Sequence, residues 1–223
     1  MAATVGVLLL PYVTMKHAFR DRDAAGARLS VLLEKYAQGN AVVLAIPAGG
    51  VPVALQIAKA LALPLHVTPV SKVLFPWTTE GGFGAVAFDG SVWLDPAAVE
   101  NYGLKEEQIA KAMADARAKV ERRSARFLNR VPDLAGKTAI VVDDGIAAGS
   151  TMRTAITALR KCRARNIVVA VPTGHERSVE AMRALADEVV CADVRGGRSF
   201  AVADAYEDWH DLSDDDVEAM LKS

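Results

Sequence analysis

The chain has 223 residues, of which 52% are hydrophobic and 24% charged, and its formal net charge is -1. This length is typical of one large domain, and the hydrophobic fraction is sufficient for a buried core. A nearly neutral chain does not favour a polyanion-binding surface, so we expect no nucleic-acid partner.

Two cysteines and one early apolar run bear on location. Cys162 and Cys191 fall in the patterns of a helix and a strand, which leaves a disulfide open but favours the reduced thiols of a cytosolic protein. The run 5–10 contains Gly6, is followed by Pro11 and is too short to span a bilayer. No basic segment precedes it and no clear cleavage site follows it. We therefore expect a cytoplasmic protein with no membrane partner.

In the first half of the chain, the sequence predicts an extended arm, a helix, and then a strand, a turn and a second helix. Residues 1–18 indicate an extended arm, in which 6–10 is either a strand or a simple extension. Leucines at helical spacing predict a helix from about 19 to 37. The apolar run 41–46 predicts a buried strand, which the Gly-rich turn 47–52 connects to a helix over 53–63.

A third strand is predicted over 65–70, ending at Ser71 and Lys72. The turn-rich stretch 74–84 follows, and then a hairpin is predicted with strands 85–88 and 91–94 around Asp89-Gly90. A long loop and a hairpin inside an alternation of strands and helices indicate either a mobile lid or a disordered insertion.

A short helix capped by Asp95 is predicted next, and then a long charged helix over 105–130 with a partly apolar face. Its Arg122, Arg123 and Arg126 are interpreted as a solvated face rather than a binding patch.

The stretch 138–153 organises the second half of the chain. Residues 138–142 predict a buried strand that stops at two acids, Asp143 and Asp144. A loop of small residues and the start of a helix come next. Loop amides and a helix N-terminus favour a phosphate, while paired carboxylates accept hydrogen bonds from the two hydroxyls of a ribose. This order of residues therefore predicts a sugar-phosphate site.

Three other interpretations of this stretch compete with the first. A P-loop requires Lys after the second Gly, where this chain has Ser150. A receiver-type acidic pocket starts a domain, whereas these acids lie well into the second half of the chain. A strand-to-helix turn with a solvated acidic pair is the third alternative. The functional interpretation is favoured because the acids and glycines fall together at the carboxyl end of a strand, where open α/β sheets bind ligands.

The remaining segments continue the alternation. We expect a helix over 151–161, a strand over 167–171, a helix over 176–185 and a strand over 188–192. His175 follows the strand, and it either lines the site or merely starts a helix. In the tail, Ser213 is predicted to cap a terminal helix.

The segment VVDDGIAAGST, residues 141–151, resembles the signature of the type I phosphoribosyltransferases, which bind phosphoribosyl pyrophosphate (PRPP). The greatest likeness is to the group called predicted phosphoribosyltransferases. The resemblance implies one domain over 1–223, an α/β fold with an open, mainly parallel sheet and helices on both faces. It also implies a flexible loop and hairpin over 74–95, which closes over the reaction centre. A small peripheral hood is implied from 1–38 and 199–223.

The resemblance also implies roles for individual residues. Asp143, Asp144 and Lys72 are the catalytic candidates. The PRPP 5′-phosphate loop comprises Gly145, Ile146, Ala147, Ala148, Gly149, Ser150 and Thr151, and the pyrophosphate loop comprises Pro47, Ala48, Gly49, Gly50 and Val51. Arg20 and Arg22 form either a phosphate clamp or a solvated helix start. Mg²⁺ is expected to arrive with PRPP, held by its oxygens and water rather than directly by the protein.

The implied activity is transfer of a 5-phosphoribosyl group from PRPP to a nitrogen nucleophile, such as a nucleobase or related heterocycle, with release of pyrophosphate. Two departures from the family's usual residues limit this inference about the activity. Relatives commonly carry Arg where this chain has Ala48, and purine-salvage members carry an acid where it has Ala147. The alternative is a regulatory protein on the same fold that binds PRPP or a nucleotide without turnover. In either case we expect a homodimer.

Overall fold

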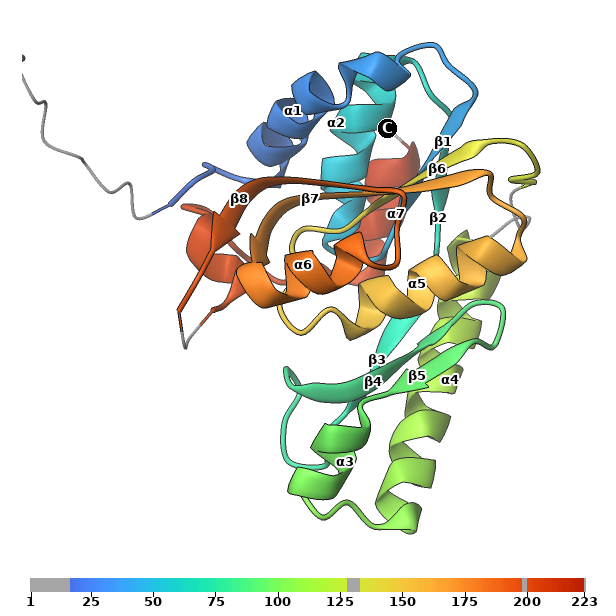
Figure 1. Ribbon diagram of the computed structural model, residues 1–223, viewed down its shortest axis with the longest axis vertical. Coiled ribbons are helices and arrows are strands. Elements are labelled where there is room, and N and C mark those ends of the chain that lie inside the picture. Colours follow the sequence, from blue (N-terminus) through green and yellow to red (C-terminus); the bar gives the residue numbers. More distant parts are fainter. Residues whose placement is uncertain (1–16, 128–132, 198–199, 223) are drawn as a thin grey trace, which may run out of the picture.

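A computed structural model describes residues 17–127, 133–197 and 200–222. Its body is a parallel sheet of five strands in the order β2-β1-β6-β7-β8 (Figure 1). The strands are β1 (Ala41–Ala45), β2 (Leu65–Val67), β6 (Thr138–Val142), β7 (Asn166–His175) and β8 (Glu188–Arg195). The open, mainly parallel sheet expected from the sequence is confirmed.

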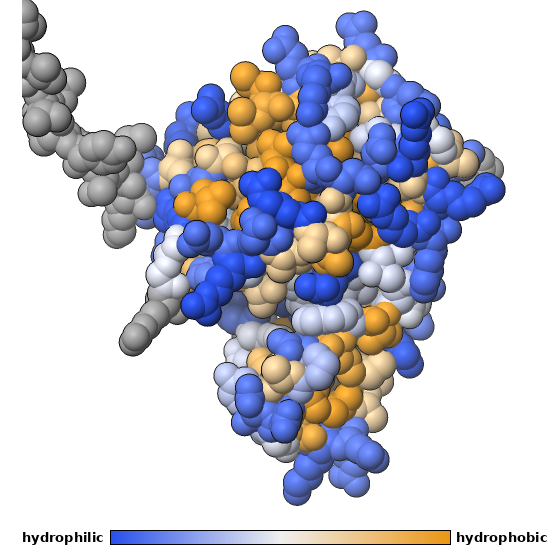
Figure 2. All heavy atoms as spheres, in the orientation of Figure 1, coloured by the Kyte–Doolittle hydropathy of each residue, from blue (hydrophilic) through white to orange (hydrophobic). Residues whose placement is uncertain are grey.

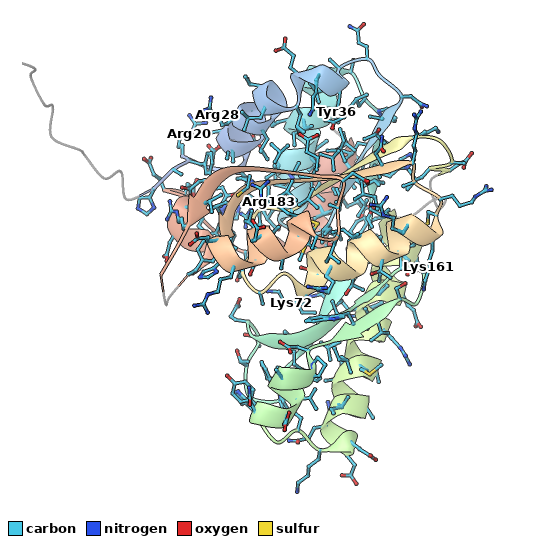
Figure 3. All side chains as sticks on the ribbon, in the orientation of Figure 1. Arg20, Arg28, Tyr36, Lys72, Lys161 and Arg183 are labelled. Carbon is cyan, nitrogen blue, oxygen red and sulfur yellow. The ribbon has the colours of Figure 1, made fainter. Side chains whose placement is uncertain are left out.

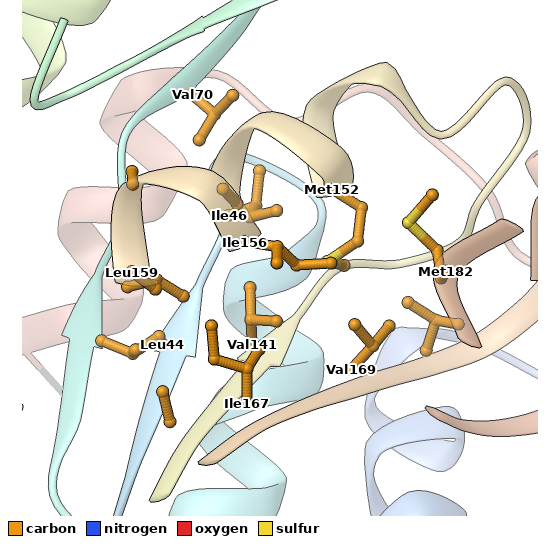
Figure 4. Packing of buried hydrophobic residues seen from close by; sticks show 14 of the residues in the cluster. Leu44, Ile46, Val70, Val141, Met152, Ile156, Leu159, Ile167, Val169 and Met182 are labelled. Carbon is orange, nitrogen blue, oxygen red and sulfur yellow. The ribbon is translucent and has the colours of Figure 1, made fainter. Parts of the chain in front are cut away.

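Helices cover both faces of this sheet because its central strands are apolar on both sides. The helices of one face are α1 (Arg22–Leu32), α2 (Gly50–Leu61) and α7 (Asp214–Lys222), and those of the other are α5 (Ser150–Lys161) and α6 (Glu176–Arg183). Figure 4 shows Met152, Ile156 and Leu159 of α5 packed on the strand residues Leu44 and Val141. Short 3₁₀ turns, η1 (Glu34–Tyr36) and η2 (Val202–Ala205), complete the body.

A smaller unit projects from the body. It consists of the antiparallel sheet β3 (Val70–Leu74), β4 (Gly82–Ala87) and β5 (Val92–Leu94), with α3 (Pro96–Asn101) and α4 (Glu106–Phe127). Figure 2 shows apolar residues on the visible face of this unit, between polar ones. Val70 and Ala85 belong to the same core cluster as α5, and Lys161 Nζ of α5 donates to Ser91 Oγ at 2.7 Å. The predicted hairpin is therefore present and packs against the body.

The predicted third strand is wrong in one respect. It divides at Thr68-Pro69 into β2, which joins the parallel sheet, and β3, which does not. Proline has no N–H to donate to a sheet ladder, so pairing changes there. Lys72 therefore lies within β3, opposite Ala85, and not at the carboxyl end of a parallel strand.

The solvated interpretation of the α4 arginines is wrong for Arg123. This side chain is buried, and its Nη1 donates to the Pro47 carbonyl at 2.8 Å while its Nε donates to Asp214 at 2.8 Å. Arg126 remains at the surface and pairs with Asp215 and Glu218. Arg123 thus joins α4, the 47–51 turn and the start of α7.

Segments from the two ends of the chain lie side by side at one edge of the body. Phe19 and Tyr206 form a parallel bridge, and the amides of Ala18 and Phe19 donate to the Ala205 carbonyl. Residues 1–16, Ser199 and Ser223 of the predicted hood, with the possible strand 6–10, lie outside the described residues. Among the described helices, none is long and apolar enough to cross a membrane.

Replacing Arg123 tests the link between α4 and the 47–51 turn. We expect Arg123→Gln to lower the free energy of unfolding by about 1–3 kcal/mol, because it leaves a buried carbonyl and carboxylate without their donor. The matched variant Arg126→Gln is expected to lower the free energy of unfolding much less, because its ion pairs are exposed. Equal losses for both variants in urea unfolding would contradict this role.

Candidate functional site

The site begins with two carboxylates at the carboxyl end of β6, which lie against the Gly-rich turn that follows β1. A Cβ atom on Gly49 would lie 1.8 Å from Asp144 Oδ2, and one on Gly50 would lie 2.6 Å from the Val142 carbonyl oxygen. Only glycine permits so close an approach. The predicted ribose acids and the predicted pyrophosphate turn are therefore in direct contact.

Burial and mutual repulsion both disfavour the negative charge of the acidic pair. Burial raises the pKa of Asp143 well above its ordinary value, and the neighbouring Asp144 raises it further. The pKa of Asp144 is also raised by burial, but the charge and hydrogen bonds of Arg22 oppose that rise. Asp143 Oδ1 accepts the amide of Asp144 at 2.9 Å. The surroundings thus oppose a negative charge more strongly at Asp143 than at Asp144, which has Arg22 as its partner.

Lys72 supplies positive charge from the smaller unit. Its charge lowers the pKa of both Asp143 and Asp144, and Figure 3 shows Lys72 where the smaller unit meets the body. It also lowers the pKa of Lys119 on α4, for which burial and Arg123 are the larger causes. Cations from β3 and α4 therefore face the acidic pair and the 47–51 turn.

The loop 145–151 is fixed near its start, at Ile146, and its later amides are open. Ile146 donates to the Thr173 carbonyl at 3.0 Å and accepts from the His175 amide at 2.9 Å. Gly149 has φ of 84°, a conformation that favours glycine, and α5 starts directly after it. Within the described residues, the amides of 147–151 have no acceptor. These amides at a helix N-terminus are suited to bind an anion, whereas the Ile146 amide is already engaged.

In the turn 47–51, too, some backbone amides donate to carbonyl groups of the protein and others do not. Gly50 N–H donates to the Ile46 carbonyl and Val51 N–H to the Ala48 carbonyl, both at 3.1 Å. In the described part of the chain, the amides of Ala48 and Gly49 have no acceptor. The Pro47-Ala48 peptide bond is cis. Two backbone donors of this turn are thus available to a ligand.

The two arginines of the possible phosphate clamp face different carboxylates. Arg20 is exposed and pairs with Asp21 at 2.7 Å. Arg22 is buried and pairs with Asp144 at 2.9 Å. His175 caps α6 and its Nε2 contacts the Gly197 carbonyl at 3.0 Å. Of these three residues, only Arg22 touches the acidic pair.

Comparison with known proteins agrees with this geometry. A sequence model described as a phosphoribosyl transferase domain matches residues 22–205. Over 206 residues, the chain is 37% identical to two proteins of Mycobacterium tuberculosis that are provisionally named phosphoribosyl transferases. The crystal structure of the TT1426 protein from Thermus thermophilus superposes with a TM-score of 0.71 at 35% identity, covering 91% of this chain and 97% of that one.

The chain belongs to the phosphoribosyl transferase family. The match to the two mycobacterial proteins covers 91% of this chain but 46% of their length, so the chain spans about half of these relatives. The acidic pair, both Gly-rich loops and Lys72 all lie inside the segment that the family model matches.

The described residues of this family member offer backbone amides without acceptors beside the acidic pair, but no cluster of side chains that could hold a metal ion. Among the described residues, no group of three or more His, Cys, Asp or Glu side chains is placed to hold a metal ion. The two site carboxylates have other partners, since Asp144 pairs with Arg22 and Asp143 accepts an amide. This donor set fits a Mg²⁺ ion that is held by the oxygens of its substrate and by water.

Sequence reasoning missed two residues of the site. Arg123 supports the Pro47 carbonyl, and Tyr206 donates its hydroxyl to the Asp144 carbonyl at 2.6 Å. A signal existed for Arg123, because it follows Ala116 and Val120 at helical spacing on the buried face of α4. For Tyr206 there was none, since the contact joins residues far apart in the sequence.

The raised pKa of Asp143 has a consequence for stability. As pH rises, the unfolded chain releases this proton first, so stability falls from about pH 4 until the raised pKa is passed. Asp143→Asn removes the ionisation and keeps an oxygen that accepts the Asp144 amide. We therefore expect this variant to melt at a higher temperature than the wild type at about pH 8, and the difference to vanish near about pH 4.

The matched variant Asp115→Asn removes an exposed carboxylate on α4, and its melting temperature should follow the wild type at both pH values. A destabilised Asp143→Asn protein at about pH 8 would contradict the assignment of a desolvated charge to this position.

Proposed function

We propose that the protein transfers a 5-phosphoribosyl group from PRPP to a nitrogen nucleophile and releases pyrophosphate. The observation that carries this proposal is the contact of the acidic pair with the Gly49 turn, beside the amides of 147–151, which have no acceptor in the described part of the chain. A ligand with a ribose diol and a phosphate group on either side of it would engage the acidic pair, the Gly49 turn and the amides of 147–151. PRPP has this arrangement of groups.

Each group has a task in the proposed reaction. The amides of 147–151, with the hydroxyls of Ser150 and Thr151, bind the 5′-phosphate. The Asp143 and Asp144 carboxyls accept the ribose hydroxyls and hold the ring in place. The amides of Ala48 and Gly49 and the Lys72 ammonium bind the pyrophosphate, whose negative charge grows as it leaves.

The bond from C1 of the ribose to the pyrophosphate oxygen breaks and a bond from C1 to the acceptor nitrogen forms. The electron pair of the first bond leaves with pyrophosphate, and the nitrogen loses a proton to solvent water. When bound with PRPP, Mg²⁺ supplies further charge neutralisation on the pyrophosphate. The negative charge of the acidic pair, close to the ring, stabilises the positive charge that develops on the ribose.

The acceptor is proposed only by class, as a nucleobase or related heterocycle. Ala147 stands where an acidic base would serve a 6-oxopurine acceptor, so we do not propose such a purine as substrate. Trp77 is 58% exposed and stacks with Phe75 at a ring distance of 5.2 Å, on the 75–81 loop of the smaller unit. This ring is suited to cover a planar ligand, whereas Phe83 is buried in the unit's own core.

Calorimetric titration with PRPP and Mg²⁺ tests this proposal. We expect the variant Asp143→Asn/Asp144→Asn to bind PRPP at least about 100-fold more weakly than the wild type, because the contacts of both carboxyl groups to the ribose, one of them charge-assisted, are weakened. The matched control, Asp115→Asn/Asp211→Asn, removes two exposed carboxylates and should bind like the wild type. Unchanged binding by the first variant would refute the site.

Pyrophosphate release separates the enzyme from a regulatory protein on the same fold. With a panel of nucleobases, release that depends on one acceptor is expected from the wild type and not from the Asp143→Asn/Asp144→Asn variant. Tight PRPP binding without release for any acceptor would favour the regulatory alternative.

A further inference from the structure

The two ends of the described chain bring one arginine to the acidic pair. Segments 18–20 and 205–208 pair along their backbones, with Glu207 N–H donating to the Phe19 carbonyl at 2.9 Å and Asp208 N–H to the Arg20 carbonyl at 2.7 Å. Asp21 caps α1 by accepting the Ala24 amide at 2.7 Å. This pairing and this cap fix where α1 starts, and therefore where Arg22 points.

All three guanidinium nitrogens of Arg22, and one face of its plane, have partners. Its Nε and Nη2 lie 3.0 Å and 2.9 Å from the same oxygen, Asp144 Oδ2. Its Nη1 donates to the His210 carbonyl at 3.0 Å, and its Cζ lies 3.8 Å from the centre of the Trp209 ring. The side chain is 8% exposed. A guanidinium with these partners has a fixed orientation.

The contact is made with only one of the two acids. Arg22 engages Oδ2 of Asp144, the atom that Gly49 also approaches, and leaves Oδ1 free of that ion pair. Asp143 receives the Asp144 amide and the more distant charge of Lys72. The two carboxyl groups are adjacent in sequence but unequal in their surroundings.

We propose that Arg22 is a positioning residue that assigns the negative charge of the acidic pair to Asp144 and turns Oδ1 of that residue toward a ribose hydroxyl. Asp143 then carries the proton and meets the second hydroxyl as a neutral group. The inference rests on the proposed function for its ribose ligand, but the assignment of the charge is a property of the protein alone.

Charged and titratable groups on the neighbouring elements affect the negative charge of Asp144. Asp144 faces Asp143 on its own loop, Arg22 from α1, Lys72 from β3 and the Tyr206 hydroxyl from the C-terminal segment. Lys72 acts on both acids, so it does not distinguish between them. Arg22 is the cation in direct contact with one acid, and it therefore decides which of the two is ionised.

The test compares Arg22→Gln with wild type in two measurements. In PRPP titrations over a pH series, binding weakens on acidification as Asp144 takes up a proton, and we expect the midpoint of this loss to move to higher pH in Arg22→Gln. At neutral pH the variant should bind PRPP about 10-fold to 100-fold more weakly. Arg22→Lys should restore part of the affinity and of the midpoint.

The second measurement needs no PRPP. NMR titration of the labelled aspartate carboxyl carbons should show Asp144 ionising at higher pH in Arg22→Gln than in the wild type. The matched variant Arg28→Gln, an exposed arginine on the same helix, should leave both titrations unchanged. If wild-type protein fails to bind PRPP, the proposed function fails, while the carboxyl titration still decides the role of Arg22.

An Arg22→Gln protein whose affinity falls equally at every pH, with an unmoved Asp144 titration, would overturn the proposal and leave Arg22 a structural residue. Should Arg22→Gln fail to fold, Trp209→Leu removes the ring over the guanidinium and keeps the ion pair. It should move the Asp144 titration in the same direction by a smaller amount, and an unmoved titration in this variant and in Arg22→Lys would also overturn the proposal.

Discussion

The arrangement of the site depends on one constraint, the burial of two adjacent carboxyl groups at the end of a parallel strand. Burial disfavours their charge, and the chain responds from several directions: Arg22 pairs with Asp144, the Asp144 amide bonds to Asp143, and Lys72 contributes charge from the smaller unit. A fold under selection for stability alone would replace such a pair with apolar residues. The pair is understandable if a ligand with hydroxyl groups completes its hydrogen bonds.

The parts of this site that are local in sequence could be predicted. The strand Thr138–Val142, the acids after it and the helix that starts at Ser150 follow from a buried apolar run, a polar stop and a small-residue loop. The turn after β1 repeats this pattern. Because parallel strands end at the same edge of a sheet, the two turns lie together in the structure, where Gly49 approaches Asp144.

The parts that depend on distant contacts could not be predicted in the same way. Nothing near Arg22 in the sequence indicates that it pairs with Asp144, since the backbone pairing of the two chain ends decides its position. Lys72 lies in the smaller sheet because the chain changes from one sheet to the other at Pro69. Proline also occurs in edge strands, so its presence in the sequence did not by itself indicate this change. Arg123 carried a readable signal, but its charge suggested solvent while its helical spacing placed it on the buried face.

The most direct test of this account is to record amide NMR spectra while PRPP and Mg²⁺ are added to the wild-type protein. The account predicts that the largest changes fall on the amides of 147–151 and of Ala48 and Gly49, which have no acceptor among the described residues. Changes centred at the opposite end of the sheet, around the cavity lined by Lys35, Asn40 and Arg165, would contradict it.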